Sequence, residues 1–370
     1  MRDQRTTFIL AFLMMCVIVL LMTVFASASL NPGTSARAFC LYEPTRDAFI
    51  SSKNLDLRLP MASTTKIMTG ILAVELAKPD ELVRIPAEAT GIEGSSVYLK
   101  PDDRLTIGDL VYSLLLQSAN DAACALAYAI SGDINEFVNL MNAKAAEIGL
   151  QDTHFDNPHG LDSPNHYTSA RDLARLTAYA LKNKTFSEIV STYSYSFYIG
   201  EKTRNLTNHN KLLRLYDGVI GVKTGYTDKS GRCLVSACVR DGITLIAVTL
   251  NDPNDWEDHK GMYEAGFSSL SHAYISDLIA KSIDIPILNA EQESLIASID
   301  HADNDFIVKT NKDDIIDVKI LYDRIQSAPF SAGDIIGKAV FSIGGKEVAR
   351  YNIISTENIP SKKCKFSLFN

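Results

Sequence analysis

Three short polar motifs follow one another along this chain, and each lies in sequence that predicts a particular local structure. S-T-T-K at residues 63–66 opens a segment with helical periodicity, S-A-N at 118–120 lies in a turn between two expected helices, and K-T-G at 223–225 lies in a strand-like run. Each motif alone is weak, because a serine at a helix start is most often only an N-cap. Together they favour a fold that joins helix ends to one strand around a shared site.

The first motif has the spacing that catalysis by a serine nucleophile requires. Residues three apart share one helix face, so Lys66 can reach the hydroxyl of Ser63. A lysine can take the serine proton only if its pKa is lowered, which partial burial and the second ammonium of Lys223 would do. We expect one lysine to act as the base, while the other stays cationic and attracts a substrate carboxylate. The backbone N–H of Ser63 would point to the site of an oxyanion.

The third motif predicts a close approach of a second backbone to the strand. Gly225 has no side chain, which suits an extended peptide that docks by β-addition. Strict alternation along a strand places Thr224 on the face opposite Lys223. Periodicity therefore gives Thr224 no role in the site.

The segments around these motifs resemble the signature regions of the penicillin-binding D-alanyl-D-alanine carboxypeptidases, serine peptidase family S11. They read LPMASTTKIMTG, LLLQSANDAACALA and GVIGVKTGYTDKSGRCLVSA, and FDNPHGLDSPNHYTSARDLARL is similar to a further family segment. The resemblance covers residues 36–266 and continues more weakly in APFSAGDIIGKAVFSIGGKEV, which resembles the family's small β domain.

This resemblance implies an α/β (α+β) fold of the serine β-lactamase and DD-peptidase type, with an antiparallel sheet flanked by helices and a small C-terminal β-rich domain. It implies that the substrate is the peptidoglycan stem peptide ending in D-Ala-D-Ala, and that β-lactam antibiotics are covalent inhibitors. No metal or organic cofactor is needed in this family. The expected activity is that of a serine-type D-Ala-D-Ala carboxypeptidase.

The resemblance also implies catalytic roles. By the family's pattern, Ser63 is acylated, Lys66 is the general base and Ser118 relays protons to the leaving D-alanine. The backbone N–H groups of Ser63 and Tyr226 form the oxyanion hole, and water then hydrolyses the acyl-enzyme. Some family members have histidine where this chain has Tyr226.

Substrate binding is expected to use further residues of the same motifs. By the family's pattern, Asn120 binds the substrate amide, and Lys223 with Thr224 holds the terminal carboxylate. Gly225 and Tyr226 complete the expected binding strand.

The N-terminal sequence predicts export. Residues 8–25 are apolar at every position except Thr23; Arg2 and Arg5 precede them, and A-S-A at 26–28 follows them. This order is typical of a secretory signal cleaved after residue 28, although an uncleaved membrane anchor fits the same length. The C-terminal SKKCKFSLFN is too short for the amphipathic anchor helix of many family members. We expect the enzyme at the outer face of the cytoplasmic membrane or in the cell wall.

The predicted organisation has three parts. Residues 1–28 are the signal peptide or anchor, residues 29–275 the catalytic domain, and residues 276–370 a β-rich domain with turn glycines.

Composition and cysteine placement exclude other classes. The formal net charge of −8 disfavours nucleic acid as a partner, because phosphate recognition needs a basic surface. Of the six cysteines, Cys16 belongs to the leader, and the remaining five are too sparse and odd a set for a disulfide framework in a chain this large. Cys233 and Cys238 have an odd spacing on one expected strand, so their side chains point to opposite faces and we expect free buried thiols.

Three alternatives remain at this stage. His154, His159 and His166 cluster in one polar loop, but their spacing does not match a helical zinc motif, and local hydrogen bonding is favoured. A serine β-lactamase shares the three motifs, but a class A enzyme also needs a deacylating glutamate, and no E-x-x-L-N is found. A non-catalytic penicillin-binding sensor or scaffold is disfavoured, since it would not need two lysines beside a serine.

Overall fold

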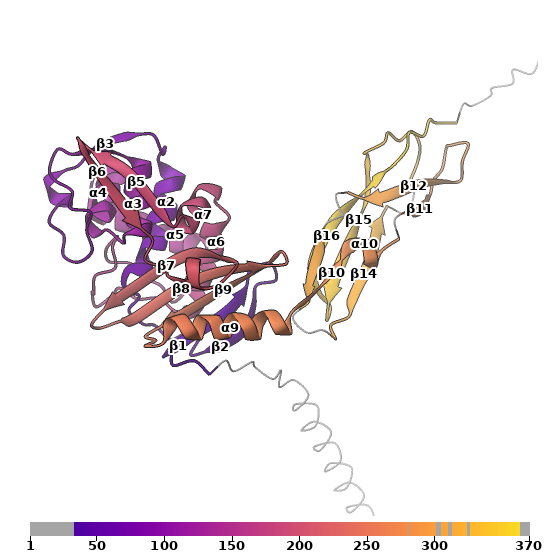
Figure 1. Cartoon of the computed structure of the whole chain (residues 1–370). Coiled ribbons are helices and arrows are strands. Elements are labelled where there is room, and N and C mark those ends of the chain that lie inside the picture. The colour runs from indigo at the N-terminus through magenta and orange to yellow at the C-terminus, as the bar shows by residue number, and fades with distance from the viewer. Residues whose placement is uncertain (1–32, 281, 301–304, 310–312, 324–325, 363–370) are drawn as a thin grey trace, which may run out of the picture. The chain divides into compact units, whose positions relative to one another are not determined.

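The computed structural model describes residues 33–280, 282–300, 305–309, 313–323 and 326–362. The chain folds as two units, with the boundary between Gly266 and Phe267 (Figure 1). The expected signal peptide or anchor at residues 1–28 and the C-terminal SKKCKFSLFN, apart from its first residues, lie outside the described residues. Within the described ranges, no helix is both long and apolar enough to cross a membrane.

The first unit is built on a five-stranded antiparallel sheet. Its strand order is β2–β1–β9–β8–β7, which leaves β7, the strand with the K-T-G motif, at one edge. β1 and β2 pair as an antiparallel hairpin, and β7, β8 and β9 pair in chain order as an antiparallel meander. The strands are β1 (Ala38–Glu43), β2 (Ala48–Lys53), β7 (Val219–Thr227), β8 (Gly231–Arg240) and β9 (Ile243–Leu250).

Helices cover both faces of this sheet (Figure 1). On one face, α9 (Asp255–Ser269) places His259 against the sheet, where its ring nitrogens bond with Ser236 on β8 at 2.6 Å and Thr249 on β9 at 3.1 Å. Residues of β8 that alternate with Ser236, including Val235, belong instead to the large apolar core beneath the other helices. Those helices are α2 (Lys66–Leu76), α3 (Ile107–Leu116), α4 (Asn120–Ser131), α5 (Ile134–Glu147), α6 (Ala170–Leu181) and α7 (Lys184–Ser191).

Side-chain caps fix two helix starts. The hydroxyl of Thr106 accepts a hydrogen bond from the Asp109 N–H, and the Asp109 carboxylate accepts from the Thr106 N–H, which completes a capping box at the start of α3. Ser169 accepts from the Asp172 N–H at the start of α6. The S-A-N turn lies between the end of α3 at Leu116 and the start of α4 at Asn120.

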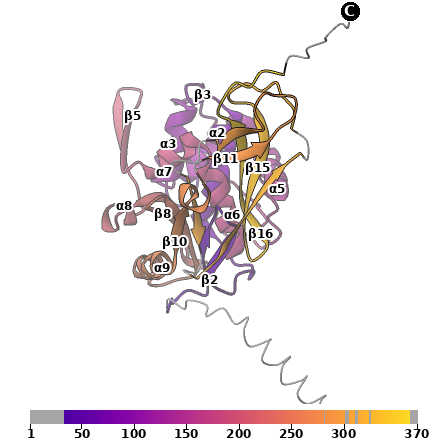
Figure 2. The ribbon, with the colours of Figure 1, turned by 90° about the vertical axis from the view of Figure 1, so that its right-hand side faces the viewer.

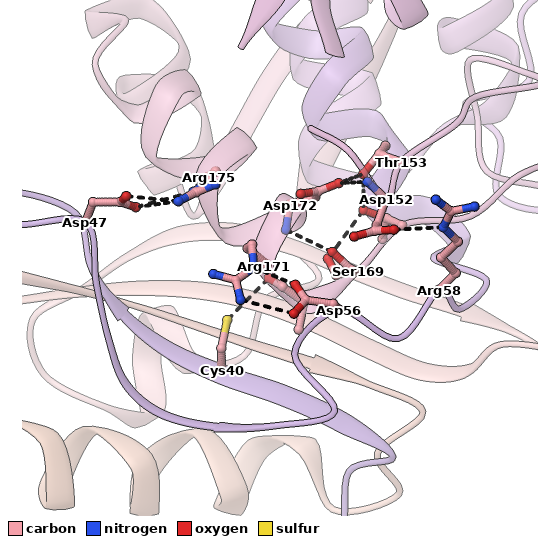
Figure 3. Close-up of polar contacts among 12 residues, drawn as sticks. Cys40, Asp47, Asp56, Arg58, Asp152, Thr153, Ser169, Arg171, Asp172 and Arg175 are labelled. Carbon is pink, nitrogen blue, oxygen red and sulfur yellow. Dashed lines mark hydrogen bonds and ion pairs between the residues drawn. The ribbon is translucent and has the colours of Figure 1, made fainter. Parts of the chain in front are cut away.

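Residues at and just before the start of α6 also form hydrogen bonds that hold the segment preceding the S-T-T-K motif. The Asp172 carboxylate accepts hydrogen bonds from the Asp152 N–H at 2.6 Å and the Thr153 hydroxyl at 2.8 Å. Leu59 and Thr168 exchange two backbone hydrogen bonds just before the motif. Figure 3 shows three ion pairs around this region, Arg171 with Asp56, Arg175 with Asp47 and Arg58 with Asp152.

Short elements complete the first unit. Figure 2 shows the hairpin of β5 and β6 standing out beside α3. These elements are η1 (Ala62–Thr65), η2 (Ala87–Ala89), the paired strands β3 (Leu82–Arg84) and β4 (Arg104–Thr106), the hairpin β5 (Ser194–Ile199) and β6 (Lys202–Thr207), and α8 (Leu212–Leu215).

The second unit is rich in β-strands, as predicted, and has its own apolar core around Leu295, Phe341 and Ile353. Its five-stranded sheet has the order β11–β12–β16–β15–β14, and β10 pairs with β13. The elements are β10 (Ser271–Tyr274), α10 (Ile275–Leu278), β11 (Ile283–Pro286), β12 (Ser294–Ile299), β13 (Phe306–Lys309), β14 (Ile316–Tyr322), β15 (Ile335–Ile343) and β16 (Lys346–Ser355).

Among the described residues of the first unit, the four cysteines Cys40, Cys124, Cys233 and Cys238 are free thiols. Cys233 and Cys238 are both buried and unbonded to each other, in agreement with their odd spacing on β8. Burial raises the pKa of each thiol to about 11, so both stay protonated at neutral pH.

The two glycines of α9 provide a test of how this helix packs on the sheet. A Cβ on Gly266 would lie 2.5 Å from Leu41 Cδ2 and 2.9 Å from Leu245 Cδ1, whereas a Cβ on Gly261 meets no atom within 4 Å. We predict that Gly261→Ala raises the free energy of unfolding by about 0.5–1 kcal/mol through helix propensity. Gly266→Ala should be less stable than Gly261→Ala by about 1–3 kcal/mol because of overpacking. Urea denaturation measures both, and equal stability of the two variants would contradict this packing.

Candidate active site

One cavity of 420 Å³ joins the three motifs. Ser63 enters it from η1 and Ser118 from the turn between α3 and α4, while Thr224, Gly225 and Tyr226 enter it from β7. The cavity continues past the motifs to residues of β8, α9 and neighbouring loops. These further lining residues are Ser95, His209, Arg232, Cys233, Asp255 and Trp256.

The serine of the first motif is not a helix cap. The sequence predicts a helix beginning near Ser63, but the α-helix α2 begins only at Lys66, and residues 62–65 form the 3-10 turn η1. Neither helix start has a side-chain cap hydrogen bond. The residue before the serine, Ala62, has a φ of +47°, a left-handed conformation that is uncommon for alanine. The hydroxyl of Ser63 is therefore free for chemistry in the cavity.

Lys66 is fully buried beside this serine. Its Nζ lies 2.9 Å from Ser63 Oγ, 2.7 Å from Asn120 Oδ1 and 2.5 Å from the carbonyl oxygen of His159. Burial, followed by the nearby charge of Lys223, holds the pKa of Lys66 well below its usual value. A neutral amine has two N–H groups and one lone pair. With the N–H groups on Asn120 and His159, the lone pair faces Ser63 and can accept its proton.

Lys223 is also buried, and it does not line the cavity. Its Nζ donates to the carbonyl oxygen of Thr224 at 2.9 Å, and burial lowers its pKa to about 7. Thr224 does line the cavity, although the alternation of side chains along the strand predicts no role for it in the site. Because β7 is an edge strand, the cavity reaches the side chain of Thr224 around the edge of the sheet.

Gly225 lies against the chain's own backbone. A Cβ at this position would lie 3.0 Å from Ser63 N and 3.1 Å from Met61 O. The sequence prediction of a close backbone approach is correct, but the neighbour that requires glycine here is η1. The glycine brings β7 and the N–H of Ser63 to one place, which is where an oxyanion hole needs its donors.

The second motif contributes two buried residues, of which Ser118 borders the cavity. Ser118 lines the cavity with a φ of +62°. Asn120 is held by its backbone N–H, which donates to Ser95 O at 2.7 Å, and by its side-chain amide, which donates to Glu93 O at 2.5 Å. Asn120 thus joins Lys66 to the loop of residues 93–99.

That loop depends on Asp121, which sequence reasoning missed. The buried Asp121 carboxylate accepts hydrogen bonds from Ser96 Oγ at 2.5 Å, Val97 N at 3.2 Å and Leu99 N at 3.0 Å. An acidic residue directly after S-A-N has the pattern of an ordinary first-turn residue of a helix, so no local signal points to this role. Asp121 positions the wall of the cavity that carries Ser95.

The three loop histidines have separate partners. Within the described ranges, no group of three or more His, Cys, Asp and Glu side chains is placed to hold a metal ion. His154 bonds with the Asn165 carbonyl at 2.9 Å, and His159 Nδ1 accepts from the Leu161 N–H at 3.2 Å. His166 bonds with Thr65 of the S-T-T-K motif at 2.7 Å. The predicted local hydrogen bonding is confirmed, and His166 connects this loop to the site.

Comparison with known proteins identifies both units. The family model of D-alanyl-D-alanine carboxypeptidases, Peptidase S11, matches residues 25–254, and the model of the penicillin-binding protein 5 C-terminal domain matches residues 280–361. The carboxypeptidase DacF of Bacillus subtilis is 31% identical over 348 residues, which cover 90% of this chain and 88% of that protein. DacC of Escherichia coli is 28% identical over 343 residues, which cover 89% and 85%.

Solved structures agree with these matches. Penicillin-binding protein 5 from Haemophilus influenzae aligns with a TM-score of 0.67 at 28% identity, covering 90% of this chain and 99% of that one. Penicillin-binding protein 6B from Escherichia coli aligns with a TM-score of 0.67 at 26% identity, covering 88% and 97%. The resemblance and the fold class predicted from the motifs are thus confirmed, and the chain belongs to the D-alanyl-D-alanine carboxypeptidases of serine peptidase family S11.

Proposed function

We propose that this chain is a serine-type D-Ala-D-Ala carboxypeptidase that removes the terminal D-alanine from peptidoglycan stem pentapeptides through an acyl-enzyme on Ser63. The observation that carries the proposal is the buried Lys66 amine, 2.9 Å from Ser63 Oγ and bonded on its other sides to Asn120 and His159. A lysine so placed, with a lowered pKa, is a base for the serine proton.

Acylation proceeds as follows. Ser63 Oγ attacks the carbonyl of the penultimate D-alanine as Lys66 takes the hydroxyl proton, and the backbone N–H groups of Ser63 and Tyr226 bind the oxyanion. The C–N bond to the last D-alanine then breaks, and its nitrogen receives a proton through Ser118. Water hydrolyses the resulting ester, with the same amine as base, and frees Ser63.

Recognition uses the remaining residues of the motifs. The cationic form of Lys223, which is buried and bonded to the Thr224 carbonyl oxygen, attracts the terminal carboxylate by its charge, the hydroxyl of Thr224 binds that carboxylate, and Asn120 binds the substrate amide. A β-lactam carries a carboxylate and a strained amide in one small molecule, so it enters the same site and acylates Ser63.

The setting of the enzyme is part of the same proposal. Residues 1–28 direct export and are the candidate N-terminal tether, the first unit performs catalysis and the second unit is the accessory β-rich domain. Such a chain works at the outer face of the cytoplasmic membrane, where its cell-wall substrate lies.

The nucleophile is tested by Ser63→Ala. We predict that D-alanine release from diacetyl-Lys-D-Ala-D-Ala falls by about ten-thousandfold or more, and that labelling by a fluorescent penicillin disappears. Ser196→Ala is the matched control, because Ser196 is an exposed serine of the β5–β6 hairpin. Persistent labelling of the Ser63→Ala protein would place the nucleophile elsewhere.

The role of Lys223 is tested by the pH dependence of kcat/KM, which reports the free enzyme. Lys223 is protonated below its pKa of about 7 and neutral above it, so carboxylate attraction is present at lower pH and lost at higher pH. We predict that kcat/KM for the peptide falls above about pH 7. In Lys223→Arg this fall should vanish, because arginine stays protonated, even if the overall rate is lower. An unchanged fall in the arginine variant would assign it to another group.

A further inference from the structure

His166 is a buried titratable residue that the mechanism above does not use. It lies in the loop between α5 and α6, is 3% exposed and packs edge-on against Phe155, with the ring centroids 5.9 Å apart. Burial lowers the pKa of His166 to about 4, so the ring is neutral near neutral pH. A neutral imidazole has one N–H donor and one acceptor nitrogen, and both are used here.

The hydrogen bonds of the ring have a defined direction. The Asp156 N–H donates to His166 Nδ1 at 3.0 Å, so the neutral ring carries its hydrogen on Nε2. Nε2 then donates to Thr65 Oγ1 at 2.7 Å, and Thr65 Oγ1 donates to the carbonyl oxygen of Ala62 at 2.8 Å. These three hydrogen bonds form one series, which begins at a backbone N–H of the loop and ends at the backbone of η1.

The loop that carries His166 is itself held by hydrogen bonds. The backbone N–H of His166 donates to the Ser163 carbonyl oxygen at 3.2 Å, and the Ser163 hydroxyl donates to the Asp156 carboxylate. The next residue, Tyr167, exchanges two backbone hydrogen bonds with His154 at 2.9 and 3.1 Å. The ring therefore reaches η1 from a loop whose own geometry is fixed.

The series ends on the residue that precedes the nucleophile. Ala62 has a φ of +47°, in which the Cβ of an L-residue lies too close to the following carbonyl oxygen. Such a conformation persists only where the surrounding structure imposes it. A Cβ on Gly160 would lie 2.0 Å from the Ala62 carbonyl oxygen, so the same loop packs its backbone directly against this oxygen. The loop thus acts on Ala62 twice, through Gly160 and, by way of Thr65, through His166.

The hydroxyl of Thr65 depends on His166 for its direction. A threonine hydroxyl that donates to the carbonyl oxygen three residues earlier is a common local bond, and Thr64 makes the same bond to Met61 O at 2.6 Å. Such a hydroxyl can rotate to another acceptor. The N–H of His166 occupies the acceptor side of the Thr65 hydroxyl, which leaves its hydrogen directed at Ala62 O.

We infer that His166 is a positioning residue, which acts through Thr65 to hold Ala62 and so aims Ser63 at the substrate. The inference rests on the proposed function, because it takes Ser63 as the nucleophile. His166 does not line the catalytic cavity, so its effect on catalysis passes through η1. A small displacement of Ser63 Oγ lengthens its distances to the Lys66 amine and to the reacting carbonyl, and acylation slows.

The first test follows acylation by a penicillin in stopped flow over a range of penicillin concentrations, which separates the acylation rate constant from the noncovalent dissociation constant. His166→Phe keeps a ring but loses both hydrogen bonds, and it should lower the acylation rate constant about tenfold. His166→Gln keeps a donor toward Thr65 and should recover part of that loss. The noncovalent affinity should stay unchanged in both variants, because the proposed carboxylate-binding hydroxyl of Thr224 lies on β7.

A double-mutant cycle tests whether the effect passes through Thr65. Thr65→Val keeps the shape of threonine without its hydroxyl, and it should also slow acylation about tenfold. Both substitutions break the same series, so the variant that combines Thr65→Val with His166→Phe should lose about tenfold and not about a hundredfold. A loss near a hundredfold would show that His166 acts by another route, which overturns the inference.

The matched control is His154→Gln, because His154 belongs to the same loop but has a side chain that is 45% exposed. This variant should be acylated at the wild-type rate, and a loss equal to that of His166→Phe would assign the effect to the loop as a whole, against the inference. Urea denaturation measures the stability of each variant. If His166→Phe does not fold, the other two variants decide: wild-type acylation by Thr65→Val overturns the inference, and slowed acylation with less loss in His166→Gln supports it.

The remaining outcomes separate the inference from the proposed function. If the wild type is acylated at Ser63 but His166→Phe is acylated equally fast, the inference is wrong and the proposed function stands. The same holds if a stably folded His166→Gln recovers nothing. If the wild type is not acylated at Ser63, the proposed function fails and the inference fails with it.

Discussion

The catalytic unit depends on one buried amine. An ammonium in an apolar interior is costly unless it is paired or loses its proton, and Lys66 has no carboxylate among its three hydrogen-bond partners. Those partners come from η1, from α4 and from the loop before α6, so these parts of the chain must converge on one point. The antiparallel sheet and the capped helices provide that convergence, because α2 and α4 pack in the same core as β8 and β9.

Close backbone packing at the nucleophile follows from this convergence. Gly160 and Gly225 each approach the η1 backbone, Gly160 at the Ala62 carbonyl oxygen and Gly225 at the N–H of Ser63. A side chain at either place would push η1 away from β7 or from the histidine loop. These two glycines thus let η1 carry Ser63 close to β7, where the proposed oxyanion donor of Tyr226 lies.

Local patterns in the sequence were enough to predict the elements that carry the motifs. The S-A-N motif lies between two helices and the K-T-G motif lies on a strand, as their surrounding sequence predicts. Strand alternation excluded Thr224 from the site, yet Thr224 lines the cavity. Alternation assigns side chains to the two faces of a sheet, whereas this cavity lies at the edge strand β7. Spacing could not reveal His166 or Asp121, because each acts on residues far away in the chain, His166 on Thr65 and Asp121 on the loop before α3.

The two lysines are coupled in a way that links recognition to catalysis. The charge of Lys223 helps to keep Lys66 neutral, yet burial lowers the pKa of Lys223 itself to about 7. Near neutral pH, Lys223 is therefore uncharged in a fraction of the free enzyme molecules. In those molecules, the charge that favours the neutral, proton-accepting form of Lys66 is lost. In the proposed function, a substrate carboxylate near Lys223 raises the pKa of Lys223 and restores that charge. Under that proposal the group that identifies the substrate also sustains the base, and a ligand without a carboxylate gains neither effect.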